Sequence, residues 1–234
     1  GKLHPLTERK IRRGTSNFTK EAAMTRQEVL TAVLTGIDAV RVLKDREYRL
    51  FTVGEMGIGN TTTSSAVASV LLRKEPELVT GCGAGLDSAG LKRKTKAIRR
   101  GIDLHQPDPM DGMEVLQKVG GFDLAAMAGA FLGGAIYHVP VVIDGVIAAA
   151  AAAAAGRIAP AATDYMLAAH VSAEPASIWL LDLIGVTPAI RAGLRLGEGT
   201  GALALFPLLD MALSIYRDMD TFAEMEIEEY KPLV

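Results

Sequence analysis

The hydrophobic positions of this chain follow two patterns, helical spacing and short apolar runs. A capping-box sequence at residues 25–28 opens a stretch with apolar residues three and four positions apart, which predicts a helix to about residue 44. The apolar run 50–53 then leads into the glycine-rich segment 54–60. Residues 61–72 have helical composition. The pattern predicts a strand, a loop and a helix in that order.

The same order recurs twice further along the chain. The run 139–143 leads through Asp144 and Gly145 into an alanine-rich helix, and the run 166–171 leads through a small-residue turn into a helix over about 174–184. Repeated strand, turn and helix indicate βαβ units, whose parallel sheet is covered on both faces. The predicted fold class is therefore α/β, a three-layer α/β/α domain with a mainly parallel, Rossmann-like sheet.

Small residues indicate close helix packing rather than chemistry. The alanine segment 148–155 follows a strand signal and is predicted to be a packed helix. Glycines at 121, 129, 133 and 134 are spaced for close contact between helices. Residues 203–219 are predicted to form another helix, and the acidic end after it to form a solvated face. No linker divides the chain, so residues 1–234 are predicted to form a single domain.

Composition narrows the classes of partner and compartment. The 234 residues are 49% hydrophobic and 22% charged, enough for a substantial core, and a net charge of −2 disfavours nucleic acid and anionic membranes as partners. Asp144 and Gly145 interrupt the most apolar region, so no membrane span is expected. The lone Cys82 fits a reducing cytoplasm and argues against a zinc site. Because the chain opens at Gly1, we expect that an upstream segment has been removed or left out.

The glycine-rich segment 54–62 suggests a phosphate site. A glycine turn between a strand and a helix exposes backbone N–H groups and the positive helix end, although a purely structural turn is equally compatible with the spacing. The glycines here follow the order G-x-x-G-x-G, which is not the dinucleotide fingerprint, and the lysine of a P-loop is absent. A dinucleotide-dependent oxidoreductase is therefore a weak alternative.

Glu198 stands among three glycines immediately before an apolar helix. Glycine lets the backbone approach a ligand closely, which makes this carboxylate a candidate general base. The alternative is that Glu198 only caps the helix that follows.

Basic residues and histidines are assigned mostly structural roles. The basic cluster is predicted to be a solvated helix face with at most one or two members turned toward an anionic ligand; it comprises Lys92, Arg93, Lys94, Lys96, Arg99 and Arg100. The turn 80–85 before it is a second candidate phosphate turn. His170, at the end of a strand, is more typical of a hydrogen-bonded structural residue than of a catalyst. His105 is expected in a turn without a catalytic role.

Several long motifs in one order are more specific than any of these features alone. They are the sequences at 53–62, 106–107, 111–112, 118–123, 143–145, 170, 172–174 and 195–202. Together they closely resemble the nicotinate-nucleotide–dimethylbenzimidazole phosphoribosyltransferase family. The resemblance covers nearly the whole chain, although polypeptides of that family begin well upstream of Gly1. It implies that the upstream part completes the benzimidazole pocket and a small helical subdomain, to which the terminal helices here also contribute.

The resemblance implies a reaction and a set of site residues. A nitrogen of 5,6-dimethylbenzimidazole attacks the anomeric carbon of nicotinate mononucleotide, and nicotinate leaves with inversion to give α-ribazole 5′-phosphate. It implies Glu198 as the catalytic base, Glu55 and Lys94 in or near the site, and a homodimer, with no metal and no dissociable cofactor. The residues it implies for the nucleotide and phosphate region are Gly57, Gly59, Asn60, Thr61, Gly83, Gly145 and Ser172.

Two expectations for the structure follow. Ligands of parallel α/β sheets bind at the carboxyl ends of the strands, so Glu55, Gly145, Ser172 and Glu198 should converge there from separate loops. The phosphate should be held by backbone N–H groups of the loop 57–61 and of Gly83. A non-catalytic ligand-binding relative that keeps the glycine loops is the second alternative to the enzyme.

Overall fold

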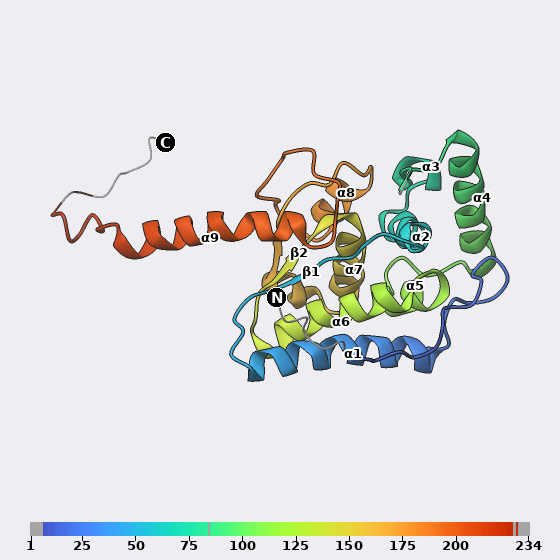
Figure 1. Cartoon of the computed structure of the whole chain (residues 1–234), viewed down its shortest axis with the longest axis horizontal. Helices are drawn as coiled ribbons and strands as arrows, with labels where there is room; N and C mark the ends of the chain where they lie inside the picture. Colours follow the sequence, from blue (N-terminus) through green and yellow to red (C-terminus); the bar gives the residue numbers. More distant parts are fainter. Residues whose placement is uncertain (1–6, 84, 227, 229–234) are drawn as a thin grey trace.

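The computed structural model describes residues 7–83, 85–226 and 228. Figure 1 shows how its helices and strands are arranged. In chain order they are α1 (Arg26–Asp45), β1 (Phe51–Val53), α2 (Thr61–Leu72), α3 (Pro76–Val79), α4 (Ser88–His105), α5 (Gly112–Val119), α6 (Phe122–Tyr137), β2 (Val141–Ile143), α7 (Gly145–Ile158), a 3-10 helix (Pro160–Tyr165), β3 (Met166–Ala168), α8 (Ser177–Leu183) and α9 (Thr200–Asp218).

The sheet is small and parallel, with the strand order β1-β2-β3. Val53 pairs with Ile143, and Ile143 pairs with Ala168, so the three strands end side by side. A parallel bridge between His170 and Ile190 extends the β3 side of the sheet. The loops that leave β1, β2 and β3 therefore begin at one common edge.

Side chains of β2 alternate between two cores, which makes the sheet the middle of three layers. Val141 and Ile143 pack into the main core, where α6 and α7 lie against β2. Val142 faces the opposite way and packs with Ala202 and Leu205 of α9. Helices thus cover both faces of the sheet, and the α/β fold class with a parallel sheet is confirmed.

The pattern located most helices to within a few residues. The helices predicted over 25–44 and 61–72 are α1 and α2, and the alanine segment is the buried interior of α7. The run 166–171 is in strand form only to Ala168. His105 is the last residue of α4 rather than part of a turn, and its Nε2 lies 2.8 Å from the carbonyl oxygen of Phe18.

Helices α1 and α6 pack closely because glycine lies at their contacts. A Cβ atom added at Gly129 would overlap the carbonyl oxygen of Val33, and one added at Gly36 would overlap that of Ala126. Gly133 also faces α1, whereas Gly134 faces Val139 and Val141. The predicted helix-contact role is therefore confirmed for Gly129 and Gly133.

Gly129→Ala is expected to destabilise the fold by about 2 kcal/mol, because the backbone of α1 must move to admit one methyl group. Urea unfolding measures this directly. Ala128→Gly on the same helix serves as a control, since it removes a methyl group without creating a clash. An unchanged free energy of unfolding for Gly129→Ala would show that the two helices are not in close contact.

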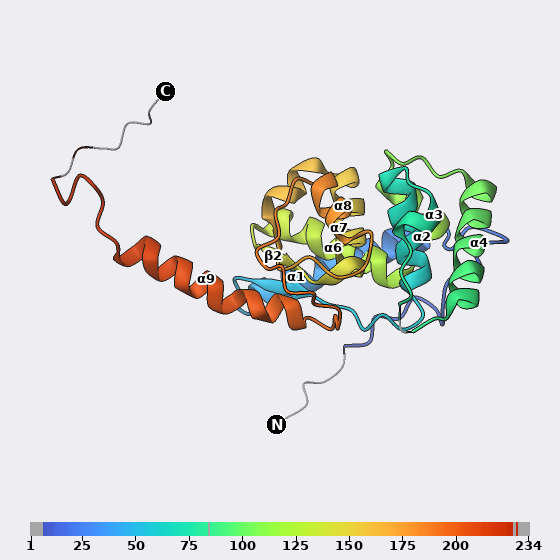
Figure 2. The ribbon, with the colours of Figure 1, turned by 90° about the horizontal axis from the view of Figure 1, so that it is seen from above.

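Helix α9 begins against the sheet and then extends away from the rest of the structure (Figure 2). Its outer part carries large apolar side chains that are exposed, among them Leu208, Met211 and Ile215. No helix in the described part of the chain is both long and apolar enough to cross a membrane.

Candidate active site

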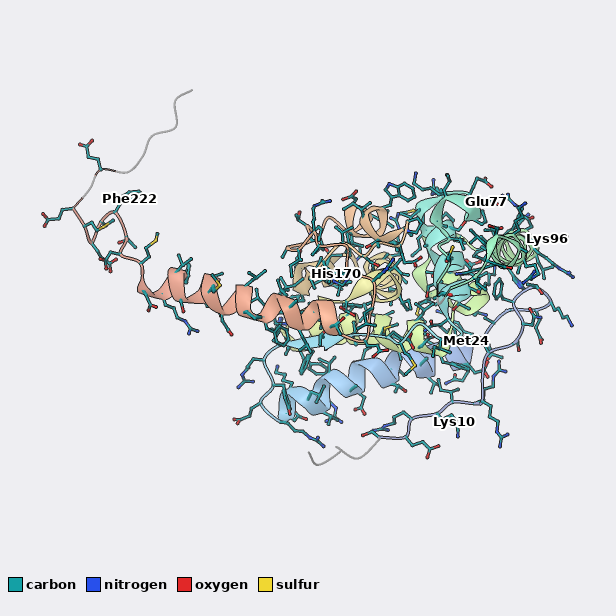
Figure 3. All side chains as sticks on the ribbon, turned by 45° about the horizontal axis from the view of Figure 1, so that its top comes forward. Lys10, Met24, Glu77, Lys96, His170 and Phe222 are labelled. Carbon is teal, nitrogen blue, oxygen red and sulfur yellow. The ribbon has the colours of Figure 1, made fainter. Side chains whose placement is uncertain are left out.

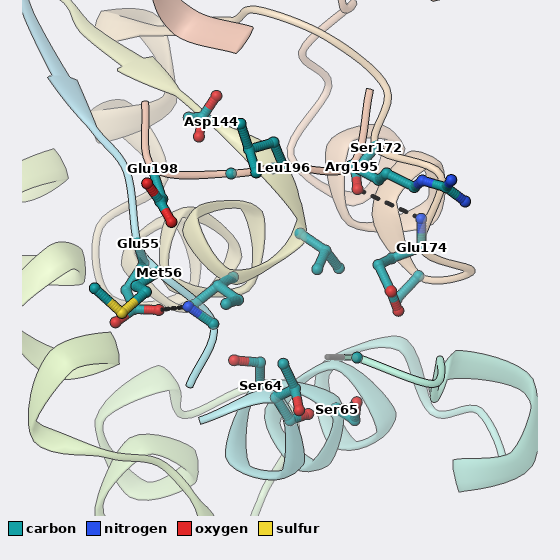
Figure 4. A pocket seen from close by; sticks show the side chains of 18 of the residues that line it. Glu55, Met56, Ser64, Ser65, Asp144, Ser172, Glu174, Arg195, Leu196 and Glu198 are labelled. Atoms are coloured by element: carbon teal, nitrogen blue, oxygen red, sulfur yellow. Dashed lines mark hydrogen bonds between the residues drawn. The ribbon is translucent and has the colours of Figure 1, made fainter. Parts of the chain in front are cut away.

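A cavity of about 400 Å³ opens where the parallel strands end (Figure 4). Its walls come from the loops after β1, β2 and β3, from one face of α2, from Gly83 and from the segment before α9. The residues that line it are Glu55, Met56, Gly57, Ile58, Thr61, Ser64, Ser65, Ala68, Val79, Gly83, Asp144, Gly145, Val146, Ile147, His170, Ser172, Glu174, Ala176, Arg195, Leu196, Gly197 and Glu198.

The loop after β1 turns at two glycines with left-handed backbone. Gly57 and Gly59 both have φ +83°, in the left-handed region that glycine adopts readily. The Glu55 carboxylate accepts a hydrogen bond from the backbone N–H of Gly57, which closes the first part of the loop. The first turn of α2 follows at Thr61 and lines the cavity. This arrangement brings the positive end of a helix to the cavity wall.

Glu198 lies in an unusual stretch of backbone. Its φ is +59°, and the flanking Gly197 and Gly199 are also left-handed, at +78° and +81°. A non-glycine residue in this region is strained and needs support from its surroundings. The backbone N–H of Glu198 donates to the carbonyl oxygen of Glu55 at 3.1 Å, which joins this segment to the loop after β1.

Asp144 supplies most of that support from the end of β2. The carboxylate is buried and accepts from the N–H of Gly199 at 2.8 Å and from the N–H of Ala202 at 3.0 Å. It therefore caps the N-terminus of α9 from another part of the chain. Glu198 is exposed and forms no capping bond, so the helix-cap interpretation of Glu198 is wrong.

His170 is buried beside Asp144. Its Nδ1 lies 3.8 Å from Asp144 Oδ1 and has no hydrogen-bond partner among the described residues. The imidazole packs against the backbone of Gly201, where a Cβ atom would collide with the ring. Burial lowers the pKa of His170 below its ordinary value, and the charge of Asp144 offsets this only in part. A neutral imidazole therefore fills the space under the start of α9.

His170→Gln is expected to flatten the dependence of stability on pH. Because the folded pKa of His170 is lowered, the unfolded chain takes up a proton that the folded chain does not, and stability is lost as the pH falls through and below the ordinary value of 6.5. The slope for one such group is at most about 1.4 kcal/mol per pH unit. Urea unfolding between about pH 5.5 and pH 8 compares the two proteins; identical pH profiles would contradict the account.

Lys94 is the one member of the basic cluster that turns inward. Its ammonium group donates to Thr61 Oγ1 and to the carbonyl oxygen of Gly81, each at 3.1 Å. Burial lowers the pKa of Lys94, and the nearby carboxylate of Glu174 partly restores it. The side chain thus lies behind the turn that carries Gly83.

The rest of the cluster is exposed on α4, where Figure 3 labels Lys96. Arg99 forms salt bridges to Glu75 and Glu77, each at 2.6 Å. The predicted solvated face is therefore confirmed for these residues, whereas Lys94, which the resemblance placed in or near the site, turns inward without lining the cavity.

The chain is similar to known proteins over nearly its whole length. A family model described as a phosphoribosyltransferase matches residues 1–227. The nicotinate-nucleotide–dimethylbenzimidazole phosphoribosyltransferase of Clostridium acetobutylicum is 48% identical over 228 residues, which are 97% of this chain and 65% of that protein. The chain belongs to this family. The protein of the same name from Ruminiclostridium cellulolyticum is also 48% identical, with the same coverage of both chains.

A solved structure is similar to the chain over nearly its whole length. The crystal structure of CobT from Thermus thermophilus superposes with a TM-score of 0.89 at 39% sequence identity, covering 98% of this chain and 69% of that one. The present chain spans about 65% of the length of the curated phosphoribosyltransferases that it matches.

Most of the site residues implied by the family resemblance lie together in the cavity. Those that line it are Glu55, Gly57, Thr61, Gly83, Gly145, Ser172 and Glu198. The expected convergence of separate loops at the strand ends is thus present. Gly59 lies outside the lining because it is at the exposed outer bend of its loop. Asn60 lies outside it because its side chain turns toward Asp123 of α6.

Several residues of this cavity could not be assigned a role from the sequence. Asp144 had one usable signal, since it follows an apolar run directly and so had to lie at a strand end. Met56, Ile58 and Leu196 are 61%, 73% and 67% exposed, and such large apolar side chains on loops at a cavity mouth carry no signal in a linear pattern. Within residues 7–83, 85–226 and 228, no three His, Cys, Asp or Glu side chains are grouped to hold a metal.

Proposed function

We propose that this chain transfers the 5-phosphoribosyl group of nicotinate mononucleotide to 5,6-dimethylbenzimidazole, forming α-ribazole 5′-phosphate and nicotinate. Family membership and the printed names of the relatives support this reaction class. The observation that carries the proposal is that one cavity combines a helix N-terminus, exposed apolar side chains and the carboxylate of Glu198. An anionic nucleotide, an aromatic base and a proton acceptor are what the reaction brings together.

The phosphate end of the nucleotide is proposed to lie at the loop 57–61 and at Gly83. Backbone N–H groups at a helix N-terminus bind anions without a basic side chain. Gly83 is close to this turn, because a Cβ atom placed on it would lie 2.9 Å from Thr61 Oγ1. The buried ammonium group of Lys94 adds positive charge behind the same turn.

The chemical step is proposed to use Glu198 as general base. Met56 and Leu196, which lie near Glu198 in Figure 4, offer apolar contacts to the azole ring, and Ile58 adds a third apolar side chain to the cavity lining. As the azole nitrogen forms its bond to the anomeric carbon, the bond from that carbon to the pyridinium nitrogen breaks, and nicotinate leaves with a neutral ring. The azole N–H proton passes to the Glu198 carboxylate, so the leaving group needs no acid.

Incubation of the chain with nicotinate mononucleotide, with and without 5,6-dimethylbenzimidazole, tests the proposal. We expect nicotinate release only when the azole is present. A non-catalytic relative would bind the nucleotide and release nothing, and an oxidoreductase would instead require NAD and change its absorbance. Either of those results would overturn the proposed function.

Crystals soaked with inorganic phosphate or nicotinate mononucleotide test the anion site. The phosphate should lie within hydrogen-bond distance of the backbone N–H groups of 57–61 and Gly83. A phosphate held only by the outer basic residues of α4 would contradict the assignment.

We also propose that the chain forms a homodimer in which the second copy packs against the outer part of α9. Leu208, Met211 and Ile215 lie three or four positions apart, which places them on one side of the helix, and all are exposed. An apolar stripe of this kind is typical of a helix that packs against another chain. The exposed thiol of Cys82 supports a reducing, cytoplasmic location for the assembly.

Met211→Glu combined with Ile215→Glu should convert the dimer into a monomer, measured by sedimentation. Asp210→Lys, an exposed substitution on the same helix, is the matched control and should leave the dimer intact. A wild-type protein that sediments as a monomer would overturn this part of the proposal.

A further inference from the structure

Asn60 ends the glycine loop, yet its side chain points away from the cavity. Its Nδ2 donates to Asp123 Oδ2 at 2.6 Å and joins the loop after β1 to the first turn of α6. Asn60 is only 7% exposed and stands at the N-cap position of α2 without forming a side-chain capping bond. Asp123 belongs to the motif 118–123, which the proposed reaction leaves without a role.

The loop needs support of this kind. Gly59 is exposed, and a Cβ atom added to it would meet nothing within 4 Å, so the loop faces open space at this position. Left-handed glycines leave the chain many alternative conformations. At the start of the loop, the Glu55 carboxylate accepts from the N–H of Gly57. At its end, the hydrogen bond between Asn60 and Asp123 joins the loop to α6.

The hydrogen bond between Asn60 and Asp123 joins an amide donor to a carboxylate acceptor. A carboxylate only accepts hydrogen bonds, so the amide must present its N–H₂ group to Asp123. Hydrogen bonds to a charged acceptor are the strong ones, and the N-terminus of α6 favours the negative charge of Asp123. The backbone oxygen of Asn60 accepts from the N–H of Ser64 at 2.9 Å, so the orientation of Asn60 also sets where α2 begins.

Helix stability alone does not account for this arrangement. Asn60 Oδ1 is buried and meets no donor in the described part of the chain, which costs free energy. An asparagine side chain turned toward its own helix would instead cap α2.

We propose that Asp123 is a positioning residue that, through Asn60, holds the glycine loop 57–61 in the conformation that binds the nucleotide phosphate. It acts on the loop and touches neither substrate. We call the hydrogen bond between Asn60 and Asp123 the tether. The role of the loop in phosphate binding rests on the proposed function, whereas the tether itself does not.

Four variants test the tether. Asp123→Ala removes the acceptor, and Asn60→Asp places two carboxylates against each other. Asp123→Asn keeps the shape and leaves a weaker, neutral bond. The double variant Asn60→Asp with Asp123→Asn restores one donor and one charged acceptor in reversed order. Thr25→Ala, which removes the capping box of α1, is the control for a general loss of stability.

Hydrogen exchange of the amides in 57–61 without ligand, and the Kd of nicotinate mononucleotide, are the readouts. Asp123→Ala and Asn60→Asp should each raise loop exchange and weaken nucleotide binding by roughly tenfold or more, with KM rising more than kcat falls. Asp123→Asn should lie between these variants and the wild type, and the double variant should return close to wild type.

Two results would overturn the inference. One is that the single variants lower Tm as Thr25→Ala does while loop exchange and Kd stay unchanged. The other is that the double variant remains as defective as Asn60→Asp, which would show that the pairing is not the cause. If the wild type bound no nicotinate mononucleotide, the proposed function would fail, and loop exchange would still decide whether the tether exists.

Discussion

Glu198→Gln is expected to lower turnover by about 10²–10⁴-fold, the usual contribution of a general base. Glutamine keeps the size of the side chain and cannot accept the azole proton. The backbone bonds that hold the segment, from Glu198 N–H to Glu55 and from Gly199 N–H to Asp144, do not involve the side chain. The Kd of nicotinate mononucleotide should therefore stay within a few-fold of wild type. Single-turnover measurements separate this chemical step from binding.

Glu47→Gln is a matched control for this substitution. Glu47 is also an exposed glutamate with a left-handed backbone, at φ +68°, and it lies outside the cavity lining. It should retain wild-type turnover. Wild-type turnover by Glu198→Gln would instead show that its carboxylate takes no part in the reaction.

Asp144→Ala is expected to cost about 3 kcal/mol of folding free energy, because it leaves the buried N–H groups of Gly199 and Ala202 without an acceptor. The same change frees the strained backbone around Glu198, and we expect kcat to fall at least about 10²-fold, since small misplacement of a catalytic group is costly. Urea unfolding and steady-state kinetics measure the two effects.

Asp111→Ala is a suitable comparison. Asp111 caps α5 by accepting from the N–H of Glu114 at 3.0 Å, but it is exposed, so its loss should cost only about 1 kcal/mol and leave kcat unchanged. If Asp144→Ala were no more harmful than Asp111→Ala, Asp144 would not be holding the Glu198 segment.

Much of the fold could be predicted because it depends on local periodicity. The apolar runs before Gly54, Asp144 and Ser172 each lead into a turn and a helix, and parallel pairing then brings the three turns to one edge. These features follow from the order of residues along the chain. The common site of Glu55 and Glu198 was implied by the family resemblance rather than by periodicity.

Other features depend on contacts between distant segments, which a linear pattern does not contain. The capping of α9 by Asp144 joins residues 55 and 58 positions apart. The inward turn of Lys94 depends on Thr61 and Gly81 lying beside α4. In the sequence, nothing distinguishes Asn60 from the other polar residues of the glycine loop. Its side chain turns away from the cavity because Asp123 of α6 lies on the other side.

The configuration of the product tests the central claim most directly. Nicotinate mononucleotide and 5,6-dimethylbenzimidazole are incubated with the chain, and the nucleotide formed is analysed by proton NMR. In-line attack in one cavity predicts the α-configured ribazole 5′-phosphate together with an equal amount of nicotinate. A β-configured nucleotide, or free ribose 5-phosphate in its place, would contradict direct transfer at this site.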